Sequence, residues 1–247
     1  MDLAGRVAVV TGASSGIGAG LAKYFVSQGM RVGLCSRRAP VLADGDSVLS
    51  RSVDVTDAVA VTGFRDAVVA KFGPIDLWVN NAGVAWPIGM MRDLDVGEMR
   101  QAMDINFWGV VHGSRAFIDH VRRGPKRAGE AVLVNLSSAA ARRARAGMSA
   151  YSASKAAIDR FTEAVAEEEK AAGIVVMALS PGMVDSGTQE LVRSMPVERM
   201  PASENNRQAA AAGRFNSPEH VAQHLLNIAF DPSARPDGFL YIVPNQF

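Results

Sequence analysis

The stretch RVAVVTGASSGIGAGLAKYF, residues 6–25, carries an apolar run, a glycine-rich turn and a helical pattern in that order. The apolar run at residues 7–10 is typical of a buried strand. Gly12, Gly16 and Gly18 follow it. Glycines at such a junction allow a tight turn, close approach of the backbone to a pyrophosphate and close helix packing, and the helix N-terminus offers free N–H groups to the anion. The stretch therefore predicts a strand, a phosphate-binding loop and a helix, although a glycine-rich loop by itself can also be a simple turn.

Six further apolar runs of strand length alternate with helical patterns along the chain. They lie at residues 31–35, 48–53, 75–79, 131–136, 174–179 and 239–243. Strands that alternate with helices imply a parallel sheet covered by helices on both faces. The length of 247 residues and the hydrophobic content of 48% suit one domain with a large buried core. We therefore predict a single α/β domain over residues 1–247, with a Rossmann-type doubly wound parallel sheet of about seven strands.

The charge balance and the single cysteine limit the classes of partner and compartment. Lys and Arg number 26 against 25 Asp and Glu, so the net charge of +1 provides no strong attraction to nucleic acid or to a membrane. Cys35 alone excludes an internal disulfide and fits a reducing cytoplasm. No apolar run approaches the length of a membrane span, and the chain enters its first strand without a signal peptide. We expect a cytoplasmic protein without nucleic-acid or membrane partners.

Tyr151 and Lys155 stand four residues apart in SAYSASKAAIDRF, residues 149–161. On a helix this spacing places both side chains on one face, one turn apart. A neighbouring positive charge lowers the pKa of a phenol, so the pair can act as a general acid or base. The alternative is a half-buried tyrosine beside a solvated lysine, and the pair needs context to decide between the two.

That context comes from motifs whose order and spacing resemble the short-chain dehydrogenase/reductase family over nearly the whole chain. The matching positions are TGASSGIG at 11–18, NNAG at 80–83, Asn106, Ser138, YSASK at 151–155 and PG at 181–182. The resemblance implies a catalytic tetrad of Asn106, Ser138, Tyr151 and Lys155, together with a nicotinamide dinucleotide. Ser137 is an equally plausible hydroxyl by composition, and only the spacing to Tyr151 selects Ser138.

Each member of the tetrad has an implied role. Tyr151 exchanges the proton of the carbonyl or alcohol oxygen, and Ser138 holds that oxygen by a hydrogen bond. Lys155 lowers the pKa of the phenol and binds the nicotinamide ribose. Asn106 holds a water molecule that links Lys155 to solvent, or else is an ordinary polar residue on a helix.

The resemblance also implies a set of cofactor contacts from the glycine loop and from the ends of several strands. These are Gly12, Ser14, Ser15, Gly16, Ile17, Gly18, Ser36, Arg37, Arg38, Asp54, Val55, Asn81, Ala82, Gly83, Tyr151, Lys155, Pro181, Gly182 and Val184. Asn80 belongs to the same NNAG motif, and the whole motif could also form a simple turn. Asp54 either meets the adenine ring or caps the helix that begins near Asp57.

The end of the second strand predicts which dinucleotide binds. Ser36 stands where relatives that prefer NAD carry Asp, and Arg37 and Arg38 follow at once. A small hydroxyl and an arginine fork suit a 2′-phosphate, so we predict NADP(H) rather than NAD(H). The segment at 38–47 is too short for a crossover with its own helix, so that helix is predicted to be lost or reduced to a turn. The adenine side should then be open and both arginines little restrained.

The segment from Gly187 to Phe215 is predicted to be a substrate lid, with an ordinary helix-turn-helix excursion as the alternative. Residues that fall near family pocket positions suggest an apolar, adaptable cavity or else plain core: Trp86, Met90, Met91, Met148 and Met183. Three arginines before Tyr151 either receive an anionic group of a substrate or partner subunit, or form a solvated loop: Arg142, Arg143 and Arg145.

Other segments are predicted to lie outside the active site. His220 and His224 have helical spacing but no third ligand accompanies them, so no metal site is predicted. The stretch RRGPKRAGE at 122–130 is predicted to be an exposed connection. The family usually forms dimers or tetramers through helices that correspond to 98–121 and 152–172, and small or apolar residues would allow close packing there: Ala153, Ala156, Ala157, Phe161 and Ala164.

Together these features predict an NADP(H)-dependent oxidoreductase that interconverts a carbonyl and an alcohol of a small molecule, and that forms a homodimer or homotetramer. Three alternatives remain. One is an NAD-dependent dehydrogenase. The second is a sugar-nucleotide epimerase or dehydratase, but the segment after Gly182 is short for the substrate domain that such enzymes need. The third is a dinucleotide-sensing protein without turnover, which the intact tetrad disfavours.

Overall fold

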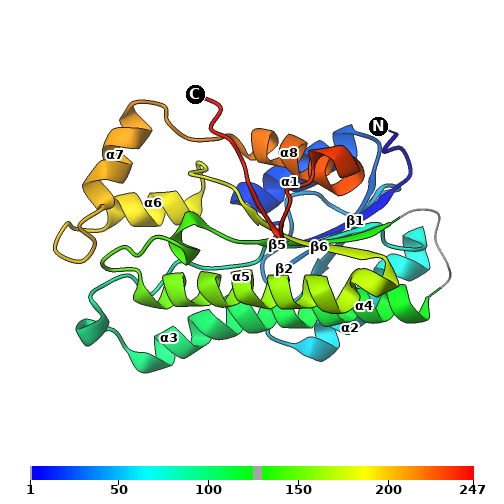
Figure 1. Cartoon of the computed structure of the whole chain (residues 1–247), viewed down its shortest axis with the longest axis horizontal. Coiled ribbons are helices and arrows are strands. Elements are labelled where there is room, and N and C mark those ends of the chain that lie inside the picture. Colours follow the sequence, from blue (N-terminus) through cyan, green and yellow to red (C-terminus); the bar gives the residue numbers. More distant parts are fainter. Residues whose placement is uncertain (1, 125–129) are drawn as a thin grey trace.

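In the computed structural model, which describes residues 2–124 and 130–247, seven parallel strands form one central sheet (Figure 1). The strands lie in the order β3-β2-β1-β4-β5-β6-β7. Their bounds are β1 Val7–Thr11, β2 Arg31–Ser36, β3 Val48–Ser52, β4 Leu77–Asn80, β5 Ala131–Leu136, β6 Ile174–Ser180 and β7 Leu240–Ile242. Every neighbouring pair runs parallel, so the predicted doubly wound sheet is confirmed.

Helices cover both faces of the sheet (Figure 1). Helices α1 and α8 lie on one face, and α2, α4 and α5 lie on the other. Helix α3 packs beside α5, while α6 and α7 pack on each other at one end of the molecule. The helix bounds are α1 Gly16–Ser27, α2 Ala58–Phe72, α3 Val96–Met103, α4 Gly109–Arg123, α5 Ser149–Glu169, α6 Gly187–Ser194, α7 Ser203–Ala211 and α8 Pro218–Phe230.

The central strand β1 supplies both cores because successive side chains of a strand point to opposite faces. Ala8 and Val10 belong to the cluster under α1 and α8, whereas Val7 and Val9 belong to the cluster under α2, α4 and α5. All four residues are buried. The continuous apolar run that predicted this strand therefore reflects a sheet that is covered on both sides.

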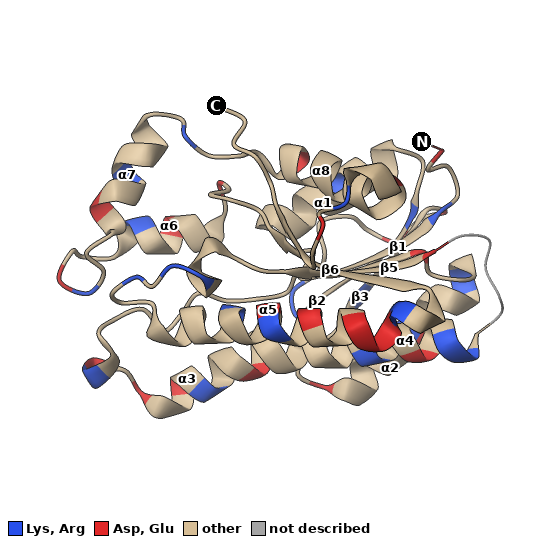
Figure 2. Ribbon diagram, in the orientation of Figure 1, with Lys and Arg blue, Asp and Glu red and all other residues tan. Residues whose placement is uncertain are grey.

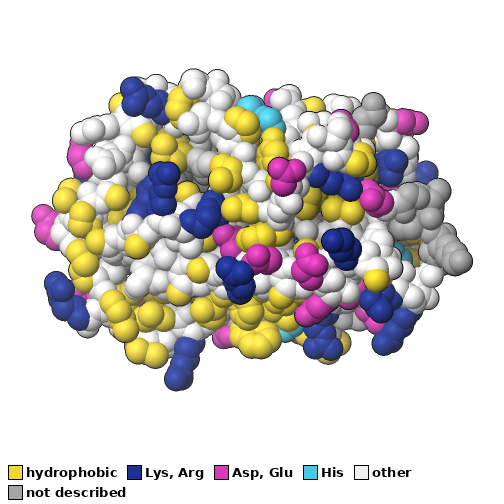
Figure 3. Space-filling view, viewed as in Figure 1, with side chains coloured by type: hydrophobic (Ala, Val, Ile, Leu, Met, Phe, Trp, Pro, Cys, Tyr) yellow, Lys and Arg dark blue, Asp and Glu magenta, His cyan; other side chains and the backbone are white. Residues whose placement is uncertain are grey.

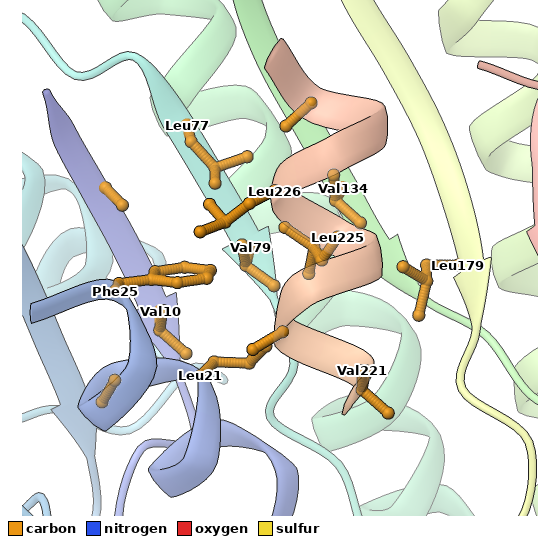
Figure 4. Packing of buried hydrophobic residues seen from close by; sticks show 14 of the residues in the cluster. Val10, Leu21, Phe25, Leu77, Val79, Val134, Leu179, Val221, Leu225 and Leu226 are labelled. Atoms are coloured by element: carbon orange, nitrogen blue, oxygen red, sulfur yellow. The ribbon is translucent and has the colours of Figure 1, made fainter. Parts of the chain in front are cut away.

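Helices α1 and α8 meet above the centre of the sheet (Figure 4). Phe25 of α1 and Leu226 of α8 point toward one another over Val79 of β4. The two helices approach closely because Gly20 has no side chain, and a Cβ at this position would collide with Pro218. This packing holds the first turn of α1 at the edge of the sheet where β1 ends.

Two strand predictions shift at their ends. The strand predicted at 75–79 begins at Leu77, because the N–H of Ile75 donates to Nε2 of His120 in α4 rather than to a strand. The strand predicted at 239–243 is reduced to Leu240–Ile242 at the edge of the sheet. The other predicted strands differ from the observed bounds by one residue at one end or not at all.

No helix connects β2 to β3, as predicted from the shortness of that segment. The chain turns instead, and Asp44 holds the turn by accepting hydrogen bonds from the N–H of Ser50 and from Nη1 of Arg51, both at 2.6 Å. The crossover that normally covers this edge of the sheet is therefore absent from the described chain.

The connection predicted to be exposed at 122–130 lies mostly outside the described residues, which omit 125–129. Within the described ranges, no helix is both long enough and apolar enough to cross a membrane.

Candidate active site

A cavity of about 840 Å³ opens at the carboxyl ends of the parallel strands. Strand order reverses between β1 and β4, and ligands of open α/β sheets bind in the crevice at such a switch point. Segments that follow β1, β2, β3, β4, β5 and β6 line this cavity, and so does helix α6. Its volume is in the range of small-molecule and cofactor sites.

Most residues predicted to contact a cofactor line this one cavity. They are Gly12, Ser14, Ser15, Gly16, Ile17, Ser36, Arg37, Arg38, Asp54, Val55, Asn81, Ala82, Gly83, Tyr151, Lys155, Pro181, Gly182 and Val184. Gly18 does not line it. A Cβ at Gly18 would collide with the carbonyl oxygen of Gly12, so this glycine permits α1 to pack against the turn instead.

The glycine loop has the backbone geometry that an anion site requires. Gly12 and Gly16 have φ angles of +70° and +55°, which favour glycine. Nδ2 of Asn81 donates to the carbonyl oxygens of Thr11 and Gly12 at 2.8 and 3.2 Å and so fixes the loop against the β4 end. Ser15 precedes α1 without a side-chain cap, which leaves the first N–H groups of the helix for a ligand. These residues fit the pyrophosphate of a dinucleotide.

The β2 end presents two unpaired cations. Oγ of Ser36 donates to the carbonyl oxygen of Arg38 at 2.6 Å, and Oγ of Ser52 donates to that of Arg37 at 3.0 Å. Both guanidinium groups are exposed and have no ion-pair or hydrogen-bond partner among the described residues. The turn is thus fixed by its backbone while the charged groups stay available.

Asp54 does not cap the helix after β3, so that alternative is wrong. Its Oδ1 accepts hydrogen bonds from the N–H and the hydroxyl of Thr56 at 3.0 and 2.9 Å. Asp57 caps α2 by accepting from the N–H groups of Val59 and Ala60. Asp54 therefore remains on the wall of the cavity.

Tyr151 and Lys155 lie one turn apart near the beginning of α5, as their spacing predicted. Nζ of Lys155 is buried and donates to the carbonyl oxygen of Leu136 at 2.7 Å. The same atom lies 5.8 Å from the centroid of the Tyr151 ring. The end of β5 therefore holds the lysine beside the phenol inside the cavity wall.

Ser138, and not Ser137, is the hydroxyl that reaches the tyrosine. The Ser138 hydroxyl lies near enough to Tyr151 to lower the pKa of its phenol, and it accepts a hydrogen bond from the N–H of Ala140 at 3.2 Å. Oγ of Ser137 is buried and has no hydrogen-bond partner among the described residues. The two side chains point differently because adjacent residues of an extended backbone point to opposite sides, and Ser138 also caps the short helix Ala139–Ala141.

Burial shifts the pKa values of both groups of the pair. It raises the pKa of Tyr151 above the ordinary value of 10.0, and the neighbouring Ser138 hydroxyl acts in the opposite direction. This direction differs from our expectation of a phenol pKa lowered by Lys155. Burial also lowers the pKa of Lys155 to about 8, while the negative charge of Asp159 raises it. Desolvation thus outweighs the attraction between neighbouring charges at this site.

Asn106 is completely buried in a π-helical turn, Asp104–Trp108, and does not line the cavity. Its Oδ1 accepts from the N–H of Val84 at 2.7 Å, and its Nδ2 donates to the carbonyl oxygen of Val84 and to Oγ of Ser154 at 2.9 and 3.0 Å. The side chain ties the segment after β4 to α5. It is therefore more than an ordinary polar residue on a helix surface.

Asn80 lies away from the cavity, contrary to our placement of it with Asn81 and Gly83. Its Oδ1 accepts from the indole N–H of Trp78 at 2.8 Å, and its Nδ2 donates to Oγ of Ser114 and Oδ1 of Asn135 at 3.1 and 2.9 Å. Because adjacent residues of a strand point to opposite faces, Asn80 faces the α4 layer and Asn81 follows the turn toward the glycine loop.

The wall beyond Tyr151 is mostly apolar. Trp86, Met148 and Met183 line the cavity, whereas Met90 and Met91 do not, and Met91 is exposed on a short 3₁₀ turn. Helix α6 closes this wall with residues that the sequence did not single out: Thr188, Gln189, Leu191 and Val192. An amphipathic pattern on such a short helix carries little signal, so only the fold identifies them.

The three arginines before Tyr151 have three different environments. Arg145 lines the cavity. Arg142 does not, because its Nη1 lies 2.8 Å from Oδ2 of Asp159 on α5. Arg143 is exposed and also lies outside the lining.

His220 and His224 hold the end of the chain against α8. A ring nitrogen of His220 lies 2.9 Å from the carbonyl oxygen of Pro244, and one of His224 lies 2.8 Å from the hydroxyl of Tyr241. Burial lowers the pKa of His224, and the neighbouring His220 acts in the same direction. Among the described residues, no cluster of three metal-ligating side chains occurs.

Comparison with known proteins identifies the family. The profile of the short chain dehydrogenases matches residues 6–196, which include the glycine loop, Ser138, Tyr151 and Lys155. This chain belongs to the short-chain dehydrogenase/reductase family. Members of this family are NAD(P)-dependent oxidoreductases, and so is this chain.

Two curated relatives and one solved structure show how far the likeness to other short-chain dehydrogenases extends. Cis-4-hydroxycyclohexanecarboxylate dehydrogenase of Sinomonas cyclohexanicum is 35% identical, over 98% of this chain and 96% of the relative. 1-Deoxy-11-beta-hydroxypentalenate dehydrogenase of Streptomyces exfoliatus is 34% identical, over 75% of this chain and 70% of the relative. The 3-ketoacyl-(acyl-carrier-protein) reductase of Brucella melitensis, solved with NADH, superimposes with a TM-score of 0.79 at 26% identity, over 98% and 97% of the two chains.

Proposed function

We propose that this short-chain dehydrogenase uses NADP(H) to interconvert a carbonyl and an alcohol, with Tyr151 as the general acid and base. The observation that carries the proposal is that Ser138, Tyr151 and Lys155 line the same cavity as the glycine loop. A nicotinamide held in this cavity supplies or accepts the hydride.

The protein groups move the proton. In the reducing direction, the Tyr151 hydroxyl donates its proton to the carbonyl oxygen as that oxygen becomes an alkoxide, and the Ser138 hydroxyl donates a hydrogen bond to the same oxygen. Because burial raises the pKa of Tyr151, the phenol keeps its proton at neutral pH and is ready to act as an acid. In the oxidising direction, the phenolate accepts the alcohol proton.

Lys155 supports this proton transfer by its positive charge beside the phenol. With a pKa of about 8 it carries a positive charge at neutral pH, which stabilises the phenolate that remains after Tyr151 gives up its proton. We also assign to Lys155 the binding of the nicotinamide ribose. Asn106 acts as a positioning residue, since its hydrogen bonds hold the segment after β4 against α5.

The preference for NADP(H) rests on the end of β2. Ser36 leaves space where an acidic side chain would repel a phosphate, and the unpaired Arg37 and Arg38 provide positive charge at the cavity wall. The Brucella relative was solved with NADH, so an NAD(H) preference is the competing possibility.

The names of the two curated relatives support a substrate class. Cis-4-hydroxycyclohexanecarboxylate and 1-deoxy-11-beta-hydroxypentalenate are both hydroxylated carboxylates. We propose that the substrate of this chain is likewise a small hydroxy or oxo carboxylic acid. The segment 187–215 acts as its lid, because helix α6 within it covers the apolar wall beyond Tyr151.

A homo-oligomer and a cytoplasmic location are further parts of the proposal. Helix α5 exposes Ala153, Ala156 and Ala164, and Trp108 of the adjacent π-helical turn is 48% exposed. Hydrophobic side chains also gather along the lower edge of the face in Figure 3. Light scattering after size-exclusion chromatography tests the oligomer, and cell fractionation tests the location.

The enzymatic proposal is tested by a ketone and alcohol screen that follows NADPH absorbance. Tyr151→Phe should lower turnover by about 10²- to 10⁴-fold and leave the dissociation constant of NADPH within about threefold. Tyr24→Phe is the matched control, because Tyr24 lies on α1 outside the cavity. A wild-type protein that binds NADPH and turns over no substrate would instead favour a dinucleotide-sensing role.

A further inference from the structure

Four cationic side chains line the cavity, and the proposed reaction uses three of them. Arg37 and Arg38 lie at the β2 end with the proposed 2′-phosphate, and Lys155 lies beside Tyr151. Arg145 is the fourth and has no role so far. Among the described lining residues, Asp54 is the one carboxylate, and it lies at the end of β3, away from the segment that carries Arg145.

Arg145 belongs to the segment that joins β5 to α5, and Figure 2 shows the blue of Lys and Arg on this segment. The carbonyl oxygen of Arg145 accepts a hydrogen bond from the N–H of Met148 at 3.1 Å, and this turn leads directly into the helix of Tyr151. The side chain is half-buried and has no ion-pair or hydrogen-bond partner among the described residues. The exposed side of the guanidinium is hydrated, and its N–H donors are free to bind an anionic group of a ligand in the cavity.

The neighbouring arginines do not place an unpaired guanidinium on the cavity wall. Arg142 is neutralised by Asp159, and Arg143 is exposed to solvent outside the cavity. In the same view as Figure 1, Figure 3 shows Lys and Arg side chains over the region where α6 approaches the segment before α5. The segment thus places one of its three cations on the cavity wall.

The part of the cavity wall around Tyr151 is apolar. Met148 and Val192 belong to a buried cluster with Ala85, Ile88 and Met200, and Tyr151 and Leu191 pack against that cluster. Because Met148, Tyr151, Leu191 and Val192 also line the cavity, the space beyond the phenol combines an apolar wall with a single guanidinium. Such a space suits a hydrocarbon frame that carries one anionic group.

We propose that Arg145 binds the carboxylate of the substrate and so selects oxo and hydroxy acids over their neutral analogues. This inference rests on the proposed function, since it assigns a residue to the substrate class named there. The planar guanidinium can bind both oxygens of a carboxylate, and partial burial strengthens that pair relative to one in water. The apolar wall holds the carbon frame, and Tyr151 and Ser138 hold the reacting oxygen at the other end.

A matched pair of ketones tests the assignment: 4-oxocyclohexanecarboxylate and its methyl ester, which differ in one charge. Arg145→Met should lower kcat/KM for the acid by about 10- to 100-fold and leave the value for the ester within about threefold. Arg145→Lys should retain part of the activity on the acid. Arg143→Met is the control from the same segment and should leave kcat/KM unchanged for both the acid and the ester.

A binding measurement gives a second readout. Calorimetric titration of the NADPH-bound protein with cyclohexanecarboxylate, which cannot react, should detect binding. Arg145→Met should weaken this binding by about 10- to 100-fold. The inference is overturned if Arg145→Met affects acid and ester equally, if it affects neither, or if the wild-type protein does not bind this carboxylate.

The experiments distinguish failure of the proposed oxidoreductase function from failure of the proposed role of Arg145. A protein that reduces the ester and other neutral ketones but prefers no carboxylate keeps the proposed oxidoreductase function and loses the role of Arg145. A protein that binds the carboxylate through Arg145 but reduces no ketone keeps the site and loses the function.

Discussion

Nη1 of Arg142 lies 2.8 Å from Oδ2 of Asp159, and this ion pair joins the segment that carries Ser138 to the helix that carries Tyr151 and Lys155. Asp159 is buried and stands one turn after Lys155, whose pKa it raises. The pair therefore does two things for the site. It holds the serine segment on α5, and it places a negative charge that favours the ammonium form of Lys155.

The first prediction concerns the pH dependence of reduction. The folded protein lowers the pKa of Lys155 from 10.5 to about 8, so the ammonium is present below about pH 8 and is lost as the pH rises through that value. If the ammonium is required, kcat should fall in the same range. Asp159→Asn removes the charge that raises this pKa and should move the fall to lower pH, as measured by pH profiles of kcat.

Arg142→Gln is the control, because it breaks the same ion pair but keeps the carboxylate of Asp159. Its profile should not move to lower pH, whatever it does to the maximal rate. Identical shifts in the two variants would mean that loss of the ion pair, and not the charge on Asp159, controls Lys155.

A second prediction separates the two adjacent serines. Ser138→Ala removes the hydroxyl beside Tyr151 and should lower kcat by about 10²- to 10³-fold, as for the loss of one donor to a developing oxyanion. Ser137→Ala removes a buried hydroxyl without a partner in the described structure and should lower kcat by less than about tenfold. Steady-state rates of the two variants test this prediction. A larger loss of kcat in Ser137→Ala than in Ser138→Ala would assign the catalytic hydroxyl to Ser137.

The third prediction concerns cofactor choice. Arg37→Ala should raise KM for NADPH by about 10- to 100-fold, because a charge-assisted contact to the phosphate is lost. KM for NADH should change by less than about threefold, because NADH has no phosphate there. Arg31→Ala is the control, since Arg31 is exposed at the opposite end of β2. Equal losses with both cofactors would show that Arg37 does not read the phosphate.

The fourth prediction concerns the packing beneath the site. A Cβ at Gly113 of α4 would collide with Oδ1 of Asn80, which cannot turn away without breaking its bonds to Trp78 and Asn135. Gly113→Ala should therefore lower the free energy of unfolding by about 1–3 kcal/mol. A Cβ at Gly63 of α2 would meet no atom within 4 Å. Gly63→Ala should therefore raise the free energy of unfolding by up to about 1 kcal/mol, since alanine favours a helix. Urea denaturation of both variants measures the difference, and a Gly113→Ala protein as stable as wild type would contradict the packing argument.

Local patterns predicted much of the fold and part of the site. The apolar runs marked the seven strands, and the short segment at 38–47 predicted the missing crossover helix, because strand burial and chain length are local properties. Tyr151 and Lys155 share a face because the helix itself sets their spacing. Local patterns failed where a residue from a distant segment intervenes. Asn80, for example, joins a buried polar network with Asn135 and does not line the cavity.

By itself, then, the sequence determined the order of strands and helices, the glycine loop and the identity of the groups available for proton transfer. The tertiary structure decided how those groups behave. Ser138 rather than Ser137 meets the phenol, burial raises rather than lowers the pKa of Tyr151, and Arg145 lines the cavity while Arg142 pairs with Asp159. The physical reason is that desolvation and charge pairing depend on atoms brought together from distant segments, and spacing along the chain does not encode them.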